Sequence, residues 1–370
     1  RETGDTIARS IEMKLLITGN MGYIGPCVVK YFRINDPDAV LIGYDIGYFA
    51  SQLTRVDLLP ECYLDRQYIG DVRYFQEDVL KGIDAVVYLA AISNDPIGNK
   101  YESVTLDINY RSAVALARKA KAAGARSFVF ASSCSTYGFA EVEAMTERSP
   151  LNPLTAYAKS KVNAERELES LAGDDFKITC LRFSTACGMS ERLRLDLVLN
   201  DFVASAVASG KITILSDGTP WRPLIHIKDM ARAIGWGIAR PLNAGGSFLV
   251  LNVGANEWNY QVRDLAEAVA KVIPGTEVSI NKDAQPDKRS YRVNFDLFRS
   301  LAPDHQPQYN LETTILELRE GLEAMTFREQ NFRNTNFMRL KIIESLREKG
   351  LLDETLRWTF HAQSRSQSIF

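Results

Sequence analysis

The sequence predicts an α/β fold in which a doubly wound parallel sheet is joined to a smaller, mainly helical α/β domain. Apolar runs without polar alternation are typical of strands buried on both faces. Five such runs occupy 14–18, 40–45, 85–90, 127–131 and 177–183. Stretches with helical apolar spacing separate them at 23–32, 104–123 and 156–171. Because strands alternate with helices, the sheet is expected to be parallel.

The second half of the chain mixes the two element types in another order. Helices are expected at 196–209, 226–240 and 261–272. Strands are expected at 211–215 and 248–253. Residues 310–358 are rich in helix formers and charge, and we expect the stretch 327–358 to form one or two helices that pack on the smaller domain.

Composition excludes several classes of function. The 370 residues carry 44 Lys and Arg against 46 Asp and Glu, so the net charge of -2 offers no basic surface for nucleic acid or an anionic membrane. No run of 18 apolar residues predicts a membrane span, and residues 1–11 lack the apolar core of a signal peptide. Five Cys without C-x-x-C spacing indicate reduced thiols in a cytoplasmic protein, and three separated His argue against a metal site.

A glycine-rich loop follows the first predicted strand. Gly19, Gly22 and Gly25 form the pattern G-x-x-G-x-x-G at the start of a helix. Such a loop allows backbone amides at a helix N-terminus to approach a diphosphate, as in a Rossmann-type fold, although the same glycines also suit an ordinary turn. Asp45 lies twenty residues beyond Gly25, at the end of the second predicted strand. A carboxylate there can accept ribose hydroxyls and repel a 2′-phosphate, which favours NAD over NADP.

A second group of residues suggests acid–base chemistry. Tyr157 and Lys161 lie one turn apart on one face of a predicted helix. A nearby ammonium lowers the pKa of a tyrosine from about 10, so Tyr157 could take a proton from a sugar hydroxyl. Ser133 ends the strand some two dozen residues upstream, and its hydroxyl could donate to the same oxygen.

With these motifs the chain resembles the extended short-chain dehydrogenase/reductases, in the branch of sugar-nucleotide epimerases and dehydratases. The resemblance covers about 13–320. Its motifs, in chain order, are Thr18-Gly19-x-x-Gly22-x-x-Gly25, Asp45, Gly70-Asp71-Val72-Arg73, Leu89-Ala90-Ala91, Asn109, Ser132-Ser133 with Tyr137-Gly138, Tyr157-x-x-x-Lys161, Arg182 with Gly188, and Asp217-Gly218 with Arg222-Pro223-Leu224-Ile225-His226-Ile227 and Asp229.

The resemblance implies roles for the motif residues. NAD is expected to bind at Gly19, Gly22, Tyr23, Ile24, Gly25, Asp45, Asp71, Val72, Leu89, Ala90, Ala91, Tyr157 and Lys161. Within this set Tyr157 would be the base and Lys161 would hold the nicotinamide ribose. Ser133 would complete the catalytic group, and Asn109 would support it.

The resemblance implies fewer residues for binding the substrate. Arg222 and Arg289 match positions where the family places arginines against the nucleotide diphosphate, and a guanidinium suits phosphate oxygens. Thr185 and Asn200 are further candidates for substrate contacts. Cys134 stands where dehydratases of the branch carry an acid, so it is either an unusual acid or a small buried residue.

The block 190–202 resembles a subgroup that includes a GDP-heptose 4-dehydrogenase. Within it, Arg192 and Arg194 could reach a phosphate or an acidic sugar, or could lie in solvent.

The resemblance implies NAD-dependent oxidation at C4 of a nucleotide-activated sugar, by a 4-epimerase or a 4-dehydrogenase. A dehydratase that uses Cys134, a 4-keto reductase and a non-catalytic NAD-binding module remain alternatives. The expected domains are 13–184 with 224–253 for the cofactor, 185–223 with 254–320 for the substrate, and a helical extension at 321–360. The family also implies a homodimer built on helices around 104–123 and 156–171.

Overall fold

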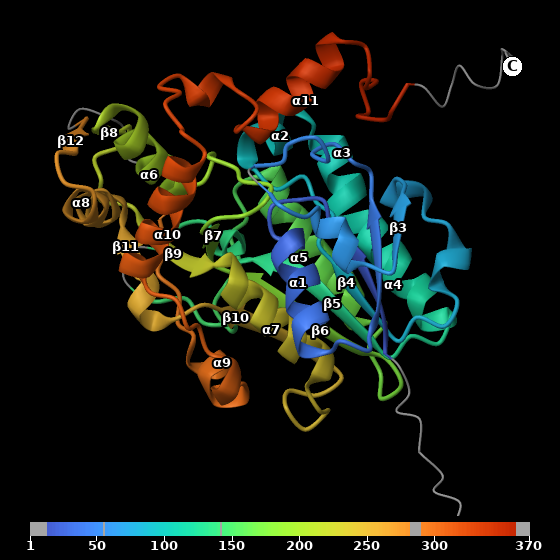
Figure 1. The fold of residues 1–370 in the computed structure, drawn as a ribbon. Helices are drawn as coiled ribbons and strands as arrows, with labels where there is room; N and C mark the ends of the chain where they lie inside the picture. The colour runs from blue at the N-terminus through green and yellow to red at the C-terminus, as the bar shows by residue number, and fades with distance from the viewer. Residues whose placement is uncertain (1–12, 55, 141–142, 282–289, 360–370) are drawn as a thin grey trace, which may run out of the picture.

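The structure, a computed structural model, describes residues 13–54, 56–140, 143–281 and 290–359 (Figure 1). Its centre is a seven-stranded sheet in the order β10-β6-β5-β4-β1-β2-β3, in which all neighbouring strands are parallel. The strands are β1 (Lys14–Thr18), β2 (Val40–Asp45), β3 (Arg66–Ile69), β4 (Ala85–Tyr88), β5 (Ser127–Ser133), β6 (Lys177–Phe183) and β10 (Phe248–Val253). The predicted doubly wound α/β fold is therefore confirmed, and strand order reverses between β1 and β4.

Helices cover both faces of this sheet. The helices α1 (Gly25–Asn35) and α7 (Ile227–Ala239) pack on each other over one face. The other face carries α3 (Glu102–Leu106), α4 (Ser112–Ala122) and α5 (Ala156–Glu169), with α2 (Asp95–Lys100) beside them. The stretch predicted as one helix at 104–123 contains a π-helical turn, Asp107–Arg111, between α3 and α4.

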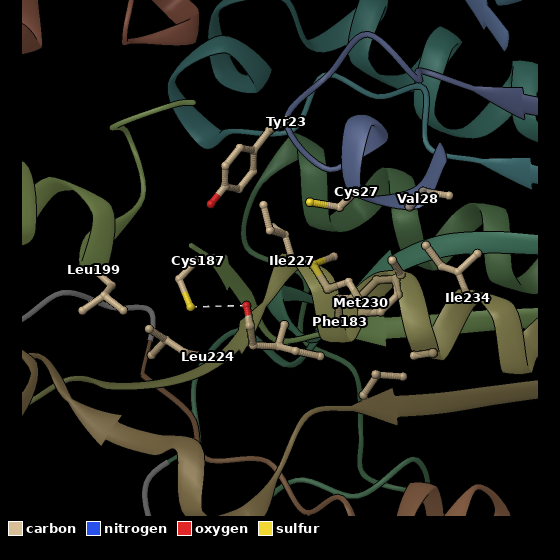
Figure 2. Packing of buried hydrophobic residues seen from close by; sticks show 14 of the residues in the cluster. Tyr23, Cys27, Val28, Phe183, Cys187, Leu199, Leu224, Ile227, Met230 and Ile234 are labelled. Carbon is tan, nitrogen blue, oxygen red and sulfur yellow. Dashed lines mark hydrogen bonds between the residues drawn. The ribbon is translucent and has the colours of Figure 1, made fainter. Parts of the chain in front are cut away.

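The strand residues alternate between the two faces. In β1, Leu15 and Ile17 belong to the apolar cluster that includes α1 and α7, whereas Leu16 belongs to the cluster on the opposite face. Since successive side chains of a strand point in opposite directions, a strand covered on both faces must be apolar throughout. Figure 2 shows part of the first cluster, where Val28 of α1 and Ile234 of α7 lie among the buried side chains.

The smaller region lies on the carboxyl-end side of the parallel sheet. It holds a three-stranded sheet of β7 (Thr185–Cys187), β9 (Trp221–His226) and β11 (Asn259–Gln261), and a parallel pair of β8 (Lys211–Ile214) and β12 (Glu277–Ile280). Its helices are α6 (Val198–Ser209), α8 (Val262–Val272), α9 (Asp296–Leu301) and α10 (Leu311–Ala324).

The C-terminal extension, the described residues 321–359, contacts both regions. Phe332 joins the cluster that holds α6 and α8, whereas Leu352 and Leu356 join the cluster under α4. The indole of Trp358 donates a hydrogen bond of 2.8 Å to the carbonyl of Ile46, just after β2. The segment therefore packs on the smaller region and also on the region of the large sheet, which was not predicted. Figure 1 shows its helix α11 (Arg339–Glu348) beside α2.

In the part of the chain that the structure describes, no helix is both long and apolar enough to cross a membrane.

Candidate active site

A cavity of about 820 Å³ opens where the parallel strands end. In open α/β sheets this edge, near the reversal of strand order, is where ligands bind. Most of the site residues expected from the sequence line it: Gly19, Gly22, Tyr23, Ile24, Gly25, Asp45, Asp71, Val72, Leu89, Ala90, Ala91, Ser133, Tyr157, Lys161, Thr185 and Arg222. Arg289 lies outside the described residues.

The glycines of the loop are required by close backbone contacts. Gly19 has a φ of +74°, and a Cβ there would lie 2.5 Å from the backbone nitrogen of Ala90. A Cβ on Gly25 would lie 1.9 Å from the carbonyl oxygen of Asn20. The helix α1 then starts at Gly25 with no acidic residue in its first turn. Its free amides and positive dipole end suit a diphosphate.

Asp45 ties this loop to the end of β2. Its carboxylate accepts hydrogen bonds from the backbone amides of Met21 at 2.9 Å and Gly47 at 2.7 Å. Burial raises the pKa of Asp45, while these two hydrogen bonds and the charge of Arg192 lower it. The carboxylate lines the cavity and has room for further donors, as a ribose-binding acid requires. The residues of this half of the cavity therefore fit a dinucleotide.

The predicted catalytic residues come together at the end of β5. Lys161 donates a hydrogen bond of 2.6 Å to the carbonyl of Ala131, and its Nζ lies 5.5 Å from the centre of the Tyr157 ring. Burial raises the pKa of Tyr157 to about 12, although a hydrogen bond with Ser133 opposes this. Burial also lowers the pKa of Lys161 to about 7. The expected lowering of the Tyr157 pKa stays a prediction for the enzyme with NAD bound, because burial has the largest effect in the protein alone.

Asn109 supports this group from the π-helical turn. Its amide nitrogen donates to the carbonyl of Ile92 at 2.9 Å and to the hydroxyl of Ser160 at 3.1 Å, and its oxygen accepts from the Ile92 amide. These bonds join α5 to the segment after β4, which lines the cavity. The supporting position agrees with the one that the family resemblance implied.

A buried ion pair holds the second half of α5. Arg182 of β6 binds Glu165 through two guanidinium nitrogens, with a shortest distance of 2.6 Å. Glu165 also accepts a hydrogen bond from Ser132, the neighbour of Ser133. Arg182 also donates a hydrogen bond of 3.0 Å to the hydroxyl of Tyr137. This network fixes the helix that carries Tyr157 and Lys161 against the strand that carries Ser133.

Two predicted substrate residues do not line the cavity. The thiol of Cys134 is buried and lies 3.1 Å from the carbonyl oxygen of Arg182. Burial raises its pKa well above the ordinary value, so the alternative of Cys134 as an acid is not supported. Asn200 is also buried, and its amide nitrogen donates to the hydroxyl of Tyr23 and the carbonyl of Arg194, each at 3.0 Å. Through its bond to Tyr23, Asn200 helps to position the glycine loop.

The two arginines of the 190–202 block are buried, so the solvent alternative is excluded. Arg194 lines the cavity, pairs with Asp196 at 2.6 Å and donates to the hydroxyl of Ser93 at 2.8 Å. Arg192 pairs with Glu61 at 2.8 Å and does not line the cavity.

Further residues line the cavity that were not predicted as site residues. Asp196 belongs to the 190–202 block noted for its resemblance, and the others, mostly from loops and the C-terminal extension, include Tyr48, Phe49, Asn94, Asp95, Tyr291, Arg333, Met338 and Arg339. Among the described residues, no three His, Cys, Asp or Glu side chains are grouped to hold a metal ion.

The sequence profile of the NAD dependent epimerase/dehydratase family matches residues 15–254. The chain belongs to this family. It is an enzyme of the extended short-chain dehydrogenase/reductase type, and its cofactor is NAD.

Relatives of known activity include a UDP-glucose 4-epimerase of Corynebacterium glutamicum, 28% identical over 279 residues, which are 70% of this chain and 80% of that protein. A UDP-glucuronic acid decarboxylase 6 of Arabidopsis thaliana is 24% identical over 87% of this chain and 89% of that protein. The similarity to a GDP-heptose 4-dehydrogenase stays a prediction.

Solved structures share the fold. The NDP-hexosamine 5,6-dehydratase TunA superposes with a TM-score of 0.73 at 23% identity, over 86% of this chain and all of that one. The UDP-glucuronic acid 4-epimerase of Bacillus cereus, solved with UDP-glucuronic acid and NAD, gives a TM-score of 0.70 at 21% identity, over 85% of this chain and all of that one.

Proposed function

We propose that this enzyme oxidises C4 of a nucleotide-activated sugar, with Tyr157 as the base. The observation that carries the proposal is the position of Ser133, Tyr157 and Lys161 in one cavity with the glycine loop and Asp45. A proton acceptor and a cofactor site must share a cavity if a hydroxyl is to lose its proton to one and a hydride to the other.

The residues divide the reaction between them. Ser133 donates a hydrogen bond to the sugar oxygen and orients its O–H toward Tyr157. Tyr157 takes the hydroxyl proton as the C–O bond becomes a carbonyl. Bound NAD+ would supply a hydride acceptor for the same carbon and a positive ring charge that favours the Tyr157 phenolate. Below about pH 7, where it is protonated, Lys161 adds positive charge beside Tyr157, and its amine would hold a hydroxyl of the nicotinamide ribose. The high pKa of Tyr157 makes these nearby charges necessary near neutral pH.

The fate of the 4-keto sugar separates the possible outcomes. If the 4-keto sugar rotates in the site and receives the hydride on its other face, the enzyme is a 4-epimerase. The activity of several relatives favours this outcome. If the ketose leaves, it is a 4-dehydrogenase. A dehydratase that relies on Cys134 is disfavoured, because that thiol does not line the cavity. The dehydrogenase and 4-keto reductase outcomes are separated from the epimerase by net change in NADH.

Replacing Tyr157 by Phe tests the proposal. Positioned acid–base groups contribute about 10²–10⁴-fold to a rate, so we expect Tyr157→Phe to lower kcat by about that factor. NAD affinity, measured by calorimetry, should stay within about twofold because the ring remains. Tyr110→Phe, outside the cavity, is the matched control. Unchanged turnover in the Tyr157 variant would remove the central claim, and so would a non-catalytic wild-type protein.

The substrate assay uses UDP-, GDP-, dTDP- and CDP-sugars, including uronic acids, in separate incubations with NAD+. We expect one of them to give a C4 epimer at constant NADH, followed by NMR. Release of a 4-keto sugar with rising NADH would assign the dehydrogenase outcome instead.

We also propose that two copies associate through α3 to α5, as the family resemblance implies. None of the large exposed hydrophobic side chains among the described residues lies on these helices.

A further inference from the structure

Three buried arginines meet beside the cofactor half of the cavity. Arg192, Arg194 and Arg339 are each at most 6% exposed. Arg339 comes from the start of α11, in the C-terminal extension, and donates a hydrogen bond of 2.7 Å to the carbonyl of Arg192. The family profile ends at residue 254, so nothing in it accounts for Arg339.

The charges of this cluster do not balance. Arg192 pairs with Glu61 and Arg194 pairs with Asp196, each at close distance. No carboxylate of the described residues pairs with Arg339, whose Nη1 is buried without a hydrogen-bond partner among them. Burial, together with the charges of Arg194 and Arg192, lowers the pKa of Arg339 to about 9, although the carboxylate of Asp196 opposes this. A buried unpaired cation is costly, and this one lines the cavity.

The surroundings of Arg339 indicate which part of the cavity it serves. Its guanidinium lies 4.3 Å from the centre of the Phe49 ring, four residues after the ribose-binding candidate Asp45. Arg192, whose carbonyl Arg339 binds, is joined to the glycine loop through Ser190, because the Ser190 hydroxyl accepts from the Arg192 amide at 3.1 Å and donates to the Tyr23 carbonyl at 2.7 Å. Arg339 therefore lies between the segment after β2 and the phosphate loop. The residues expected at the sugar, Ser133 and Tyr157, belong to β5 and α5 instead.

We propose that Arg339 binds the diphosphate of NAD, so that the C-terminal extension completes the cofactor site. The missing counter-charge is then a phosphate oxygen, which the guanidinium can hold by charge-assisted hydrogen bonds. Two hydrogen bonds hold the segment after α11 against the region of the large sheet. Trp358 donates to the carbonyl of Ile46, and Arg73 donates to the carbonyl of Thr355 at 2.6 Å. The glycine loop and Arg339 would bind the diphosphate from two sides.

The test measures binding without any sugar substrate, so its outcome is independent of the proposed C4 chemistry. Arg339→Met keeps the side-chain length and removes the charge. We expect its affinity for ADP-ribose, measured by calorimetry, to fall about tenfold or more, since that factor corresponds to about 1.4 kcal/mol and charged hydrogen bonds contribute about 1.5–3 kcal/mol. Affinity for adenosine, which has no phosphate, should not change.

Lys341→Met is the matched control on the same helix, because Lys341 is 40% exposed and pairs only with Glu344 in this region. It should leave both affinities unchanged. Equal binding of ADP-ribose by wild type and Arg339→Met would overturn the proposal. Loss of affinity for UDP alone, with ADP-ribose unaffected, would assign the arginine to the nucleotide sugar and also overturn it.

A second measurement covers the case in which Arg339→Met does not fold. In the wild-type chain, ADP-ribose should slow hydrogen exchange of the 339–348 amides, and adenosine should not. Equal exchange in the presence of the two ligands would contradict a diphosphate contact by α11.

Discussion

At the residue scale, burial controls the protonation of the two predicted catalytic groups. The same desolvation moves the pKa of Tyr157 upward and that of Lys161 downward, because each charged form loses water. The pair and its spacing were predicted from the sequence, but that prediction considered only the effect of nearby positive charges on the pKa of Tyr157. The spacing of two residues on one helix turn does not indicate how deeply each side chain is buried in the fold.

The lowered pKa of Lys161 predicts a pH dependence of stability. Between about pH 7 and pH 10.5 the unfolded chain holds a proton on Lys161 that the folded chain does not. The unfolded state then binds more protons, so stability contributed at this site rises with pH, by up to about 1.4 kcal/mol per pH unit. Below pH 7 both states are protonated and the contribution is constant.

Urea unfolding of wild type and Lys161→Met at several pH values between 6 and 10 measures this effect. We expect the wild type to gain stability relative to the variant as the pH rises above 7. Lys159→Met, an exposed position on α5, should run parallel to the wild type. A constant difference between wild type and Lys161→Met across this range would show that Lys161 keeps its ordinary pKa.

At the element scale, the ion pair of Arg182 and Glu165 joins β6 to α5. Removing one partner of a buried pair leaves an uncompensated charge and costs about 3–5 kcal/mol. We expect Glu165→Gln to lower the free energy of unfolding by an amount near the lower end of this range, because the amide keeps one hydrogen bond. Glu169→Gln, exposed near the end of α5, should change it by less than about 0.5 kcal/mol.

Denaturant titration of both variants checks this. A Glu165→Gln protein as stable as Glu169→Gln would mean that the network contributes little and that packing alone holds α5.

Strands with a continuous apolar run were predictable, including β10 at one edge of the large sheet, whereas strands without such a run were missed. β3 reads Arg66-Gln67-Tyr68-Ile69, an edge strand with exposed ends that has no apolar run. β9 contains Pro223 and joins a short sheet through partners distant in the chain. An edge strand is stabilised by pairing with a neighbour that the sequence does not specify locally.

At the scale of the whole molecule, the proposed dimer predicts a particle of twice the chain mass of 41.5 kDa. Sedimentation at micromolar concentrations measures it. Arg111 is exposed in the π-helical turn, so Arg111→Glu should weaken the dimer if the contact runs through these helices. Arg319→Glu on α10 should not. A monomer at all concentrations would contradict the proposal.

The sequence by itself determined the α/β class, the glycine loop with Asp45, and the group of Ser133, Tyr157 and Lys161, because each depends on spacing within one or two neighbouring elements. Only the tertiary structure decided that Cys134 and Asn200 lie away from the cavity and that Arg339 lies at it. These depend on contacts between segments up to 290 residues apart, as between Phe49 and Arg339, or on the depth of one side chain. The local sequence pattern does not indicate these contacts or the depth of a side chain, because both depend on packing between elements that are distant in the chain.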